Sequence, residues 1–213
     1  MSEIIKGSCE ATQSLKKLVD MVSNSNSTVL LRGETGCGKD IVARAIHESS
    51  KRKGKLVNVN CAAIPSELLE SELFGHEKGS FTGADSKREG RFEISNQGTL
   101  FLDEIGDMPM SLQAKLLRAI ETRTIQRVGG KDEIELDLRL ICATHQNIEK
   151  KIDEGSFRAD LFYRINVFPI EIPTLSERKN DIPELLKHIL SEIKNTGSKI
   201  PTFDESSLTA LKE

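Results

Sequence analysis

The sequence is poor in aromatic residues, cysteine and long apolar runs, and each shortage excludes a class of protein. It has no Trp and one Tyr, and aromatic residues make up 4% of its 213 residues, which argues against a surface that stacks single-stranded bases. Its four cysteines form no CxxC pair, so neither a zinc site nor a disulfide framework is indicated. The longest apolar runs, such as Thr99 to Leu102, are too short to span a bilayer. The N-terminus lacks the basic flank and apolar stretch of a secretory signal, so we expect a cytoplasmic protein with no membrane segment.

The sequence also has no excess of positive charge. Thirty Lys and Arg against 33 Asp and Glu give a net charge of −3, so there is no bulk attraction to phosphate backbones or anionic lipid. A DNA-binding module is disfavoured on this ground, and these residues contain no helix-turn-helix pattern. A hydrophobic fraction of 37% with 30% charged residues is typical of a globular protein. The length predicts one sizeable domain and part of a second.

Short apolar runs alternate with longer amphipathic segments along the chain. The runs predict strands at 28–32, 56–60, 99–102, 138–144 and 167–172. The amphipathic segments predict helices at 12–22, 39–49, 67–73, 112–120 and 182–193, and a further helical pattern begins at 203. Apolar strands separated by helices are typical of a mostly parallel sheet covered on both faces, so the predicted class is α/β. Ligands of such sheets bind beyond the carboxyl ends of the strands.

Two segments depart from this alternation. Residues 124–137 alternate on both sides of Gly129-Gly130, which predicts an inserted hairpin. Residues 75–90 are polar, glycine-rich and too long for a simple connection, which makes them a candidate functional loop.

A GxxxxGK motif lies directly between the first predicted strand and the next predicted helix. Its glycines let backbone N–H groups turn around phosphate oxygens, the helix N-terminus favours the negative charge, and the lysine adds a mobile cation. The expected nucleotide-binding residues are Gly33, Glu34, Thr35, Gly36, Cys37, Gly38, Lys39, Asp40 and Ile41. Asp40 replaces the usual Ser or Thr that binds Mg²⁺, so its carboxylate must reach the metal directly or through water.

Two adjacent carboxylates end the buried strand at 99–102. They suit a Walker B element, in which Asp103 holds Mg²⁺ through its water shell and Glu104 orients and deprotonates the attacking water. At this point a GTPase or a small-molecule kinase is also open, although the absence of a guanine-specific NKxD sequence counts against the GTPase.

Longer segments carry a resemblance to a known family. They read GETGCGKD, NCAAIPSELLESELFGHEKGSFTGA, GRFEISNQGTLFLDEIGDMP, LQAKLLRAIE, RVGG and FRADLFYRINVFPIEIPTLSERKNDI. Together they closely resemble the AAA+ domain of sigma-54-dependent transcription activators, from about residue 4 to the end. The resemblance implies a three-layer sandwich around a central parallel five-stranded sheet over residues 1–175. It also implies that residues 176–213 begin a helical lid, which we expect to continue beyond this chain.

The resemblance also implies what the protein does and with what partners. The segment Gly79, Ser80, Phe81, Thr82, Gly83 and Ala84 is similar to the family's GAFTGA loop and would contact sigma-54 RNA polymerase. Phe81 would be the apolar anchor between flexible glycines. Hydrolysis of ATP with Mg²⁺ would move this loop and remodel the polymerase from closed toward open complexes. DNA would be bound only through a domain absent from this chain.

Further roles follow from the resemblance position by position. Asn60 matches a switch residue that holds Glu104 away from water, although a turn cap is its alternative. Thr144 matches a γ-phosphate sensor, and His145 stands where the family commonly has Asn. Arg158 and Arg164, expected on one helix, are similar to arginine fingers that reach a neighbouring subunit.

Fingers of that kind require a homo-oligomeric ring, usually a hexamer in this family. Ile5 lies in a segment similar to the one that packs on adenine. The alternative function is an ATP-binding, ring-forming regulatory scaffold with little turnover.

Overall fold

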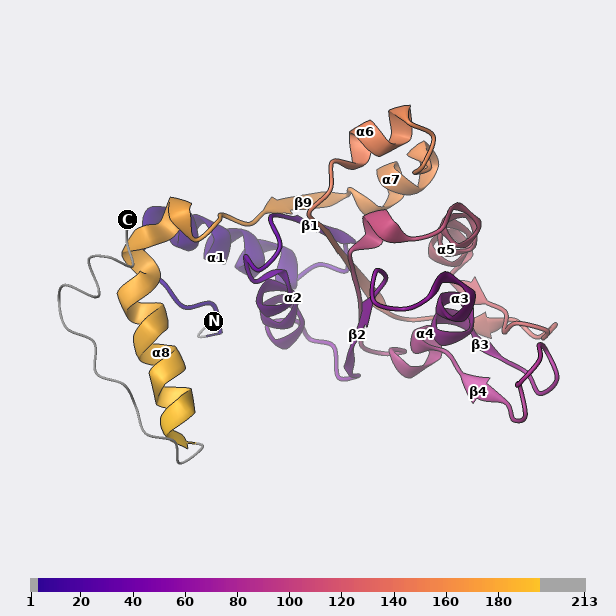
Figure 1. Cartoon of the computed structure of the whole chain (residues 1–213). Helices are drawn as coiled ribbons and strands as arrows, with labels where there is room; N and C mark the ends of the chain where they lie inside the picture. Colours follow the sequence, from indigo (N-terminus) through magenta and orange to yellow (C-terminus); the bar gives the residue numbers. More distant parts are fainter. Residues whose placement is uncertain (1–3, 196–213) are drawn as a thin grey trace.

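The computed structural model describes residues 4–195, and its centre is a five-stranded parallel sheet (Figure 1). The strand order is β2-β5-β8-β1-β9, and every neighbouring pair is parallel. These strands are β1 (Val29–Arg32), β2 (Leu56–Asn60), β5 (Thr99–Asp103), β8 (Arg139–Thr144) and β9 (Phe168–Glu171). All five predicted strands are confirmed, with ends that differ by at most one residue. The inner strands β1, β5 and β8 have the continuous apolar runs of strands buried on both faces, whereas the edge strands β2 and β9 also carry exposed residues.

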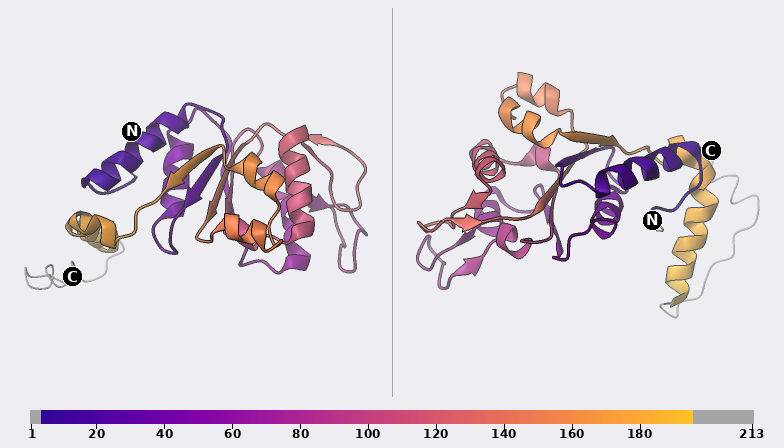
Figure 2. Two further views of the ribbon diagram at one scale, coloured as in Figure 1. Left: turned by 90° about the horizontal axis from the view of Figure 1, so that it is seen from above. Right: turned by 180° about the vertical axis from the view of Figure 1, so that it is seen from behind.

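Helices cover both faces of this sheet. In β1, Val29 and Leu31 pack in the apolar cluster that includes α1 (Glu10–Ser23) and α2 (Lys39–Glu48). Leu30 packs in the cluster that includes α3 (Ser66–Phe74), α5 (Met110–Thr122) and α7 (Ala159–Ile165). Successive side chains of a strand point to opposite faces, so an unbroken apolar strand serves both clusters. Figure 2 shows the sheet between the indigo pair α1 and α2 and the helices of the opposite face. The predicted three-layer α/β architecture is confirmed.

The helices agree with the predicted periodicity where they are long. They are α1 (Glu10–Ser23), α2 (Lys39–Glu48), α3 (Ser66–Phe74), α4 (Arg91–Ile94), α5 (Met110–Thr122), α6 (Ile148–Asp153), α7 (Ala159–Ile165) and α8 (Ile182–Asn195), with 3₁₀ turns η1 (Ile105–Asp107) and η2 (Ser176–Asp181). The sequence pattern does not predict α4 and α6, because 4 and 6 residues are too few to show a helical period. The helical pattern from 203 lies outside the described residues, and the division at 175/176 stays a prediction.

Two antiparallel hairpins extend from the α3–α5 side of the sheet. The first joins β3 (Gly75–His76) to β4 (Arg88–Glu89), and the second joins β6 (Thr124–Ile125) to β7 (Ile134–Glu135). The predicted hairpin at 124–137 is therefore confirmed. The first hairpin separates α3 from α4, whose residues Phe74 and Phe92 stack with ring centroids 5.2 Å apart.

The base of the first hairpin requires glycine. A Cβ at Gly90 would lie 2.4 Å from the backbone nitrogen of Gly75, which is closer than atoms can approach. The two hairpins are joined by backbone bonds, since Val128 N donates to Gly75 O at 2.9 Å and Glu77 N donates to Val128 O at 3.1 Å. The candidate functional loop thus has a rigid support.

The described chain ends in α8, which lies beside the α1–α2 side of the molecule (Figure 1). Within residues 4–195, no helix is both long and apolar enough to cross a membrane.

Candidate functional site

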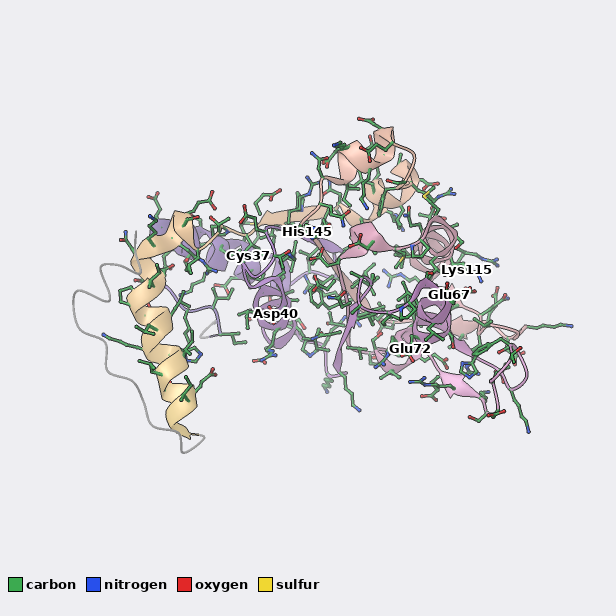
Figure 3. The ribbon with its side chains drawn as sticks, viewed as in Figure 1. Cys37, Asp40, Glu67, Glu72, Lys115 and His145 are labelled. Atoms are coloured by element: carbon green, nitrogen blue, oxygen red, sulfur yellow. The ribbon has the colours of Figure 1, made fainter. Side chains whose placement is uncertain are left out.

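The predicted phosphate loop connects β1 to α2. Gly38 caps α2 with φ +97°, a left-handed conformation that an L side chain rarely adopts, so the glycine is needed for the chain to enter the helix directly. Gly33 N donates to Thr144 O at 3.3 Å, which places the start of the loop beside the end of β8. Figure 3 labels Asp40 on α2 and Cys37 in the loop before it. His145, which the figure also labels, directly follows β8.

Lys39 is buried inside the loop. Its Nζ donates to the carbonyls of Gly33 at 3.1 Å and Glu34 at 3.2 Å, and it lies 3.5 Å from Glu104 Oε1. The Lys39 ammonium group is therefore held between the backbone of the phosphate loop and the carboxylate of Glu104, the residue that directly follows β5. The three elements that sequence spacing assigned to one site do meet in space.

Two acids at the end of β5 concentrate negative charge beside this lysine. Asp103 Oδ1 accepts a hydrogen bond from Glu104 N at 3.0 Å. Burial raises the pKa of Asp103, and the nearby charges of Glu104 and Asp40 raise it further. Glu104 itself is buried and has φ +51°, a left-handed conformation that a non-glycine residue rarely adopts. This strained backbone turns its carboxylate away from the line of the strand.

His145 holds the Glu104 carboxylate, a contact that sequence reasoning missed. His145 Nδ1–H donates to Glu104 Oε2 at 2.7 Å, and the His145 backbone N–H donates to the same oxygen at 3.3 Å. The signal present in the sequence was a histidine directly after Thr144, at a position where the family commonly has Asn. Nothing in the sequence indicated that it would reach a carboxylate 41 positions away.

Asn60 and Thr144 end the strands on either side of this pair of acids. Asn60 pairs in register with Asp103, but its Oδ1 accepts from the backbone N–H groups of Ala62 at 2.9 Å and Ala63 at 3.0 Å. In this structure Asn60 therefore has the turn-cap arrangement, and the Glu104 carboxylate is held by His145 and Lys39. The buried Thr144 hydroxyl accepts from Gln146 N at 3.0 Å.

The two candidate finger arginines lie at opposite ends of α7. The expectation that both lie on the helix is wrong for Arg158, which is the N-cap and pairs with Asp160 through Nη2 at 2.6 Å. Its side chain turns back because the aspartate of the first turn is only two residues away. Arg164 is exposed in the last turn, and neither arginine contacts the phosphate loop among residues 4–195.

A cavity of about 620 Å³ opens beside the loop. Ile4 and Ile5 line its apolar side, and Cys37, Gly38 and Ile41 line the loop side. The expected contact of Ile5 with adenine stays a prediction. Arg178 also lines the cavity, and sequence reasoning did not single out this residue. The cavity has an apolar wall next to a turn of backbone N–H groups, which suits a ligand with a flat apolar part and phosphates.

The loop at 79–84 projects from the first hairpin. Gly79 N donates to Ala84 O at 2.8 Å, which closes the loop, and Ala84 is buried. The Phe81 side chain is 40% exposed and its ring meets His76 edge-on with centroids 5.0 Å apart. Phe81 is thus presented at the surface rather than packed into the core.

A half-buried arginine supports this loop from the second hairpin. Arg127 Nη1 donates to Glu77 Oε1 at 2.9 Å, and Arg127 Nε donates to Glu93 Oε1, also at 2.9 Å. The same contacts lower the pKa of Glu77. Arg127 thus joins the loop, α4 and the second hairpin.

The protein's own donors fit a partly hydrated Mg²⁺. Within residues 4–195 no group of three or more His, Cys, Asp or Glu could hold a metal by itself. Asp103 and Asp40 are close enough for their charges to interact, and burial together with the charges of Glu104 and Asp40 raises the pKa of Asp103. Mg²⁺ commonly takes one or two carboxylates together with phosphate oxygens and waters, so the donor type of these two residues suits this ion.

The strand order, the GxxxxGK loop after β1 and the acids ending β5 define a P-loop domain of the AAA+ type. A family model described as the sigma-54 interaction domain matches residues 5–171, and the chain belongs to this family.

Similar proteins agree with this family. The chain is 54% identical over 185 residues to the DNA-binding transcriptional activator HyfR of Escherichia coli K12, a match that covers 86% of the chain and 28% of that protein. It is 55% identical over 187 residues to a Nif-specific regulatory protein of Azorhizobium caulinodans, with 87% and 30% covered. The chain thus spans less than a third of these relatives.

Solved structures show the same fold. The crystal structure of NtrX from Brucella abortus in complex with ATP superposes with a TM-score of 0.89 at 37% identity, covering 97% of this chain and 45% of that one. A P-loop NTPase domain from E. coli aligns at 14% identity with a TM-score of 0.52, which supports the fold alone.

Proposed function

We propose that this chain is the ATP-hydrolysing module of a transcription activator and that it remodels sigma-54 RNA polymerase from closed toward open complexes. The observation that carries the proposal is the meeting of Lys39, Asp103 and Glu104 at one sheet edge, in a chain that belongs to the sigma-54 interaction domain family. The ATP complex of the similar NtrX structure supports the choice of nucleotide.

Each residue of this edge has a distinct task in the proposed reaction. Lys39 would leave its loop carbonyls and pair with the β- and γ-phosphates. Asp103, with Asp40, would hold Mg²⁺, which supplies charge neutralisation on the phosphate oxygens. Glu104 would orient the attacking water and accept its proton. Thr144, at the end of β8, would donate its hydroxyl to the γ-phosphate.

Glu104 must change partners before it can act. Its Oε2 is occupied by two donors of His145, and its Oε1 lies beside Lys39. A phosphate that attracts Lys39 removes one of these contacts and leaves His145 as the second restraint. We infer that the proposed Asn60 switch shares this task with His145, since Asn60 lies beside Asp103 in the sheet.

The neighbouring subunit would complete the site. Arg164 is exposed, and Arg158 is held by a surface ion pair that costs little to break. In a homo-oligomeric ring, proposed to be a hexamer, these arginines would stabilise charge on the transferring phosphoryl group of the next subunit. The surface loop with Phe81 would then transmit the nucleotide state to sigma-54.

Phosphate release at increasing protein concentration tests the catalytic and ring proposals. Specific ATPase activity should rise with concentration, because each site needs its neighbour. The Glu104→Gln variant should bind ATP without hydrolysing it. Mixing Arg164→Ala with Lys39→Ala subunits should restore part of the turnover, since mixed interfaces pair an intact loop with an intact finger. Activity independent of concentration would contradict the trans arrangement.

A regulatory scaffold with little turnover is the second candidate. The observation that favours it is the hold of His145 on Glu104. Nucleotide-dependent assembly without phosphate release, both in the wild type and in His145→Asn, would favour the scaffold.

A further inference from the structure

Arg178 reaches the phosphate loop from a distant part of the chain. Its Nη2 donates to the Cys37 carbonyl at 2.8 Å across 141 positions of sequence. Its backbone, with φ −126° and ψ 38°, interrupts the helical run of η2. Arg178 is therefore part of the wall of the cavity beside the loop.

One N–H donor of the Arg178 guanidinium has no acceptor. Arg178 Nε is buried and has no hydrogen-bond partner. A buried charged donor without an acceptor is costly, and a guanidinium is a group of five donors suited to phosphate oxygens. The cavity that it lines also contains Gly38, whose neighbouring backbone forms the phosphate loop.

The segment that carries Arg178 is anchored independently. Asp181, three residues later, accepts hydrogen bonds from Ser8 N at 2.7 Å, Cys9 N at 2.8 Å and the Thr12 hydroxyl at 2.5 Å. The carboxylate thus ties η2 to the first turn of α1, whose preceding residues Ile4 and Ile5 line the same cavity. Because Asp181 holds η2 against the start of α1, the position of Arg178 at the cavity wall is fixed.

We infer that Arg178 is a nucleotide-binding residue, which braces the loop through the Cys37 carbonyl and donates through Nε to a phosphate of the bound nucleotide. The inference rests on the proposed function and adds a second cation to Lys39. Lys39 contacts the carbonyls of Gly33 and Glu34, whereas Arg178 contacts the carbonyl of Cys37. No covalent step is involved.

Titration calorimetry of the purified 213-residue chain tests the inference, with ADP and adenosine as ligands. Arg178→Gln should weaken ADP binding by about 10-fold to 100-fold, the range of a hydrogen bond to a charged group, and leave adenosine binding unchanged. Arg178→Lys, which keeps the charge, should recover part of the loss. Arg118→Gln is the matched control, because Arg118 is an exposed arginine on α5 that does not line this cavity.

Ionic strength separates a phosphate contact from a bracing role. If Arg178 pairs with phosphate, Arg178→Gln should show a weaker salt dependence of ADP affinity than the wild type, since one charge pair is gone. Lower ADP affinity with unchanged salt dependence would overturn the phosphate contact and leave only the brace. An equal loss in Arg118→Gln would overturn it in favour of a general charge effect. Wild-type affinity in Arg178→Gln would overturn the inference alone, whereas a wild type that binds no ADP would refute the proposed function.

Discussion

Asp181→Asn should destabilise the fold by a predictable amount. The native carboxylate is buried and accepts two backbone N–H groups and the Thr12 hydroxyl, and these bonds outweigh burial and lower its pKa from 3.8 to about 2. One pKa unit corresponds to about 1.4 kcal/mol, so the shift contributes about 2 kcal/mol to the free energy of unfolding at neutral pH. Asparagine keeps the size and one acceptor of the side chain but loses the charge.

The pH dependence has a definite sign. Because the native pKa lies below the unfolded value of 3.8, the contribution is fully present above pH 5 and is lost as the pH falls toward 2. At pH 3 about half of it should remain. The difference in unfolding free energy between the wild type and Asp181→Asn should therefore be largest at pH 7 and shrink between pH 5 and pH 3.

Urea unfolding followed by circular dichroism at pH 7, 5 and 3 measures this difference. Asp132→Asn is the control, because Asp132 is exposed in the second hairpin and its replacement should change stability by less than about 0.5 kcal/mol. Equal stability of Asp181→Asn and wild type at pH 7 would refute the reasoning. A difference that is the same at pH 7 and pH 3 would show that packing, rather than charge, is responsible.

Three further predictions concern other parts of the molecule. At pH 8, iodoacetamide should modify Cys9 alone in the native chain, because burial raises the pKa of the other three thiols. The pKa of Cys61 is raised to about 12. Two or more adducts per chain in mass spectrometry would contradict this prediction. Arg127→Ala should lower stability by about 2 kcal/mol and speed proteolysis within residues 75–90, since it removes the contacts that join the two hairpins. Phe81→Ala should keep wild-type phosphate release while losing a complex with sigma-54 trapped by a transition-state analogue; an undiminished complex would exclude Phe81 as the contact.

Much of the fold follows from patterns that are short in sequence. A strand that is buried on both faces is recognised in the sequence by consecutive apolar residues, as in Val29 to Leu31, because both of its faces must be covered. The phosphate loop and the acid pair are equally local, since the glycine spacing and a carboxylate at a strand end have direct chemical meaning. The parallel arrangement then brings Lys39 and Glu104 to one edge of the sheet, as the motif spacing predicts.

The tertiary structure decided which partners these groups have. His145 holds Glu104, Arg178 reaches Cys37, and Asp181 binds the start of α1, across 41 to 173 positions of sequence. No period or motif encodes such contacts, because they arise only when the sheet order and the helix packing set the distances. The residue types and their spacing determined the fold class and the phosphate-loop chemistry; the three-dimensional packing decided what restrains the acid and what braces the loop.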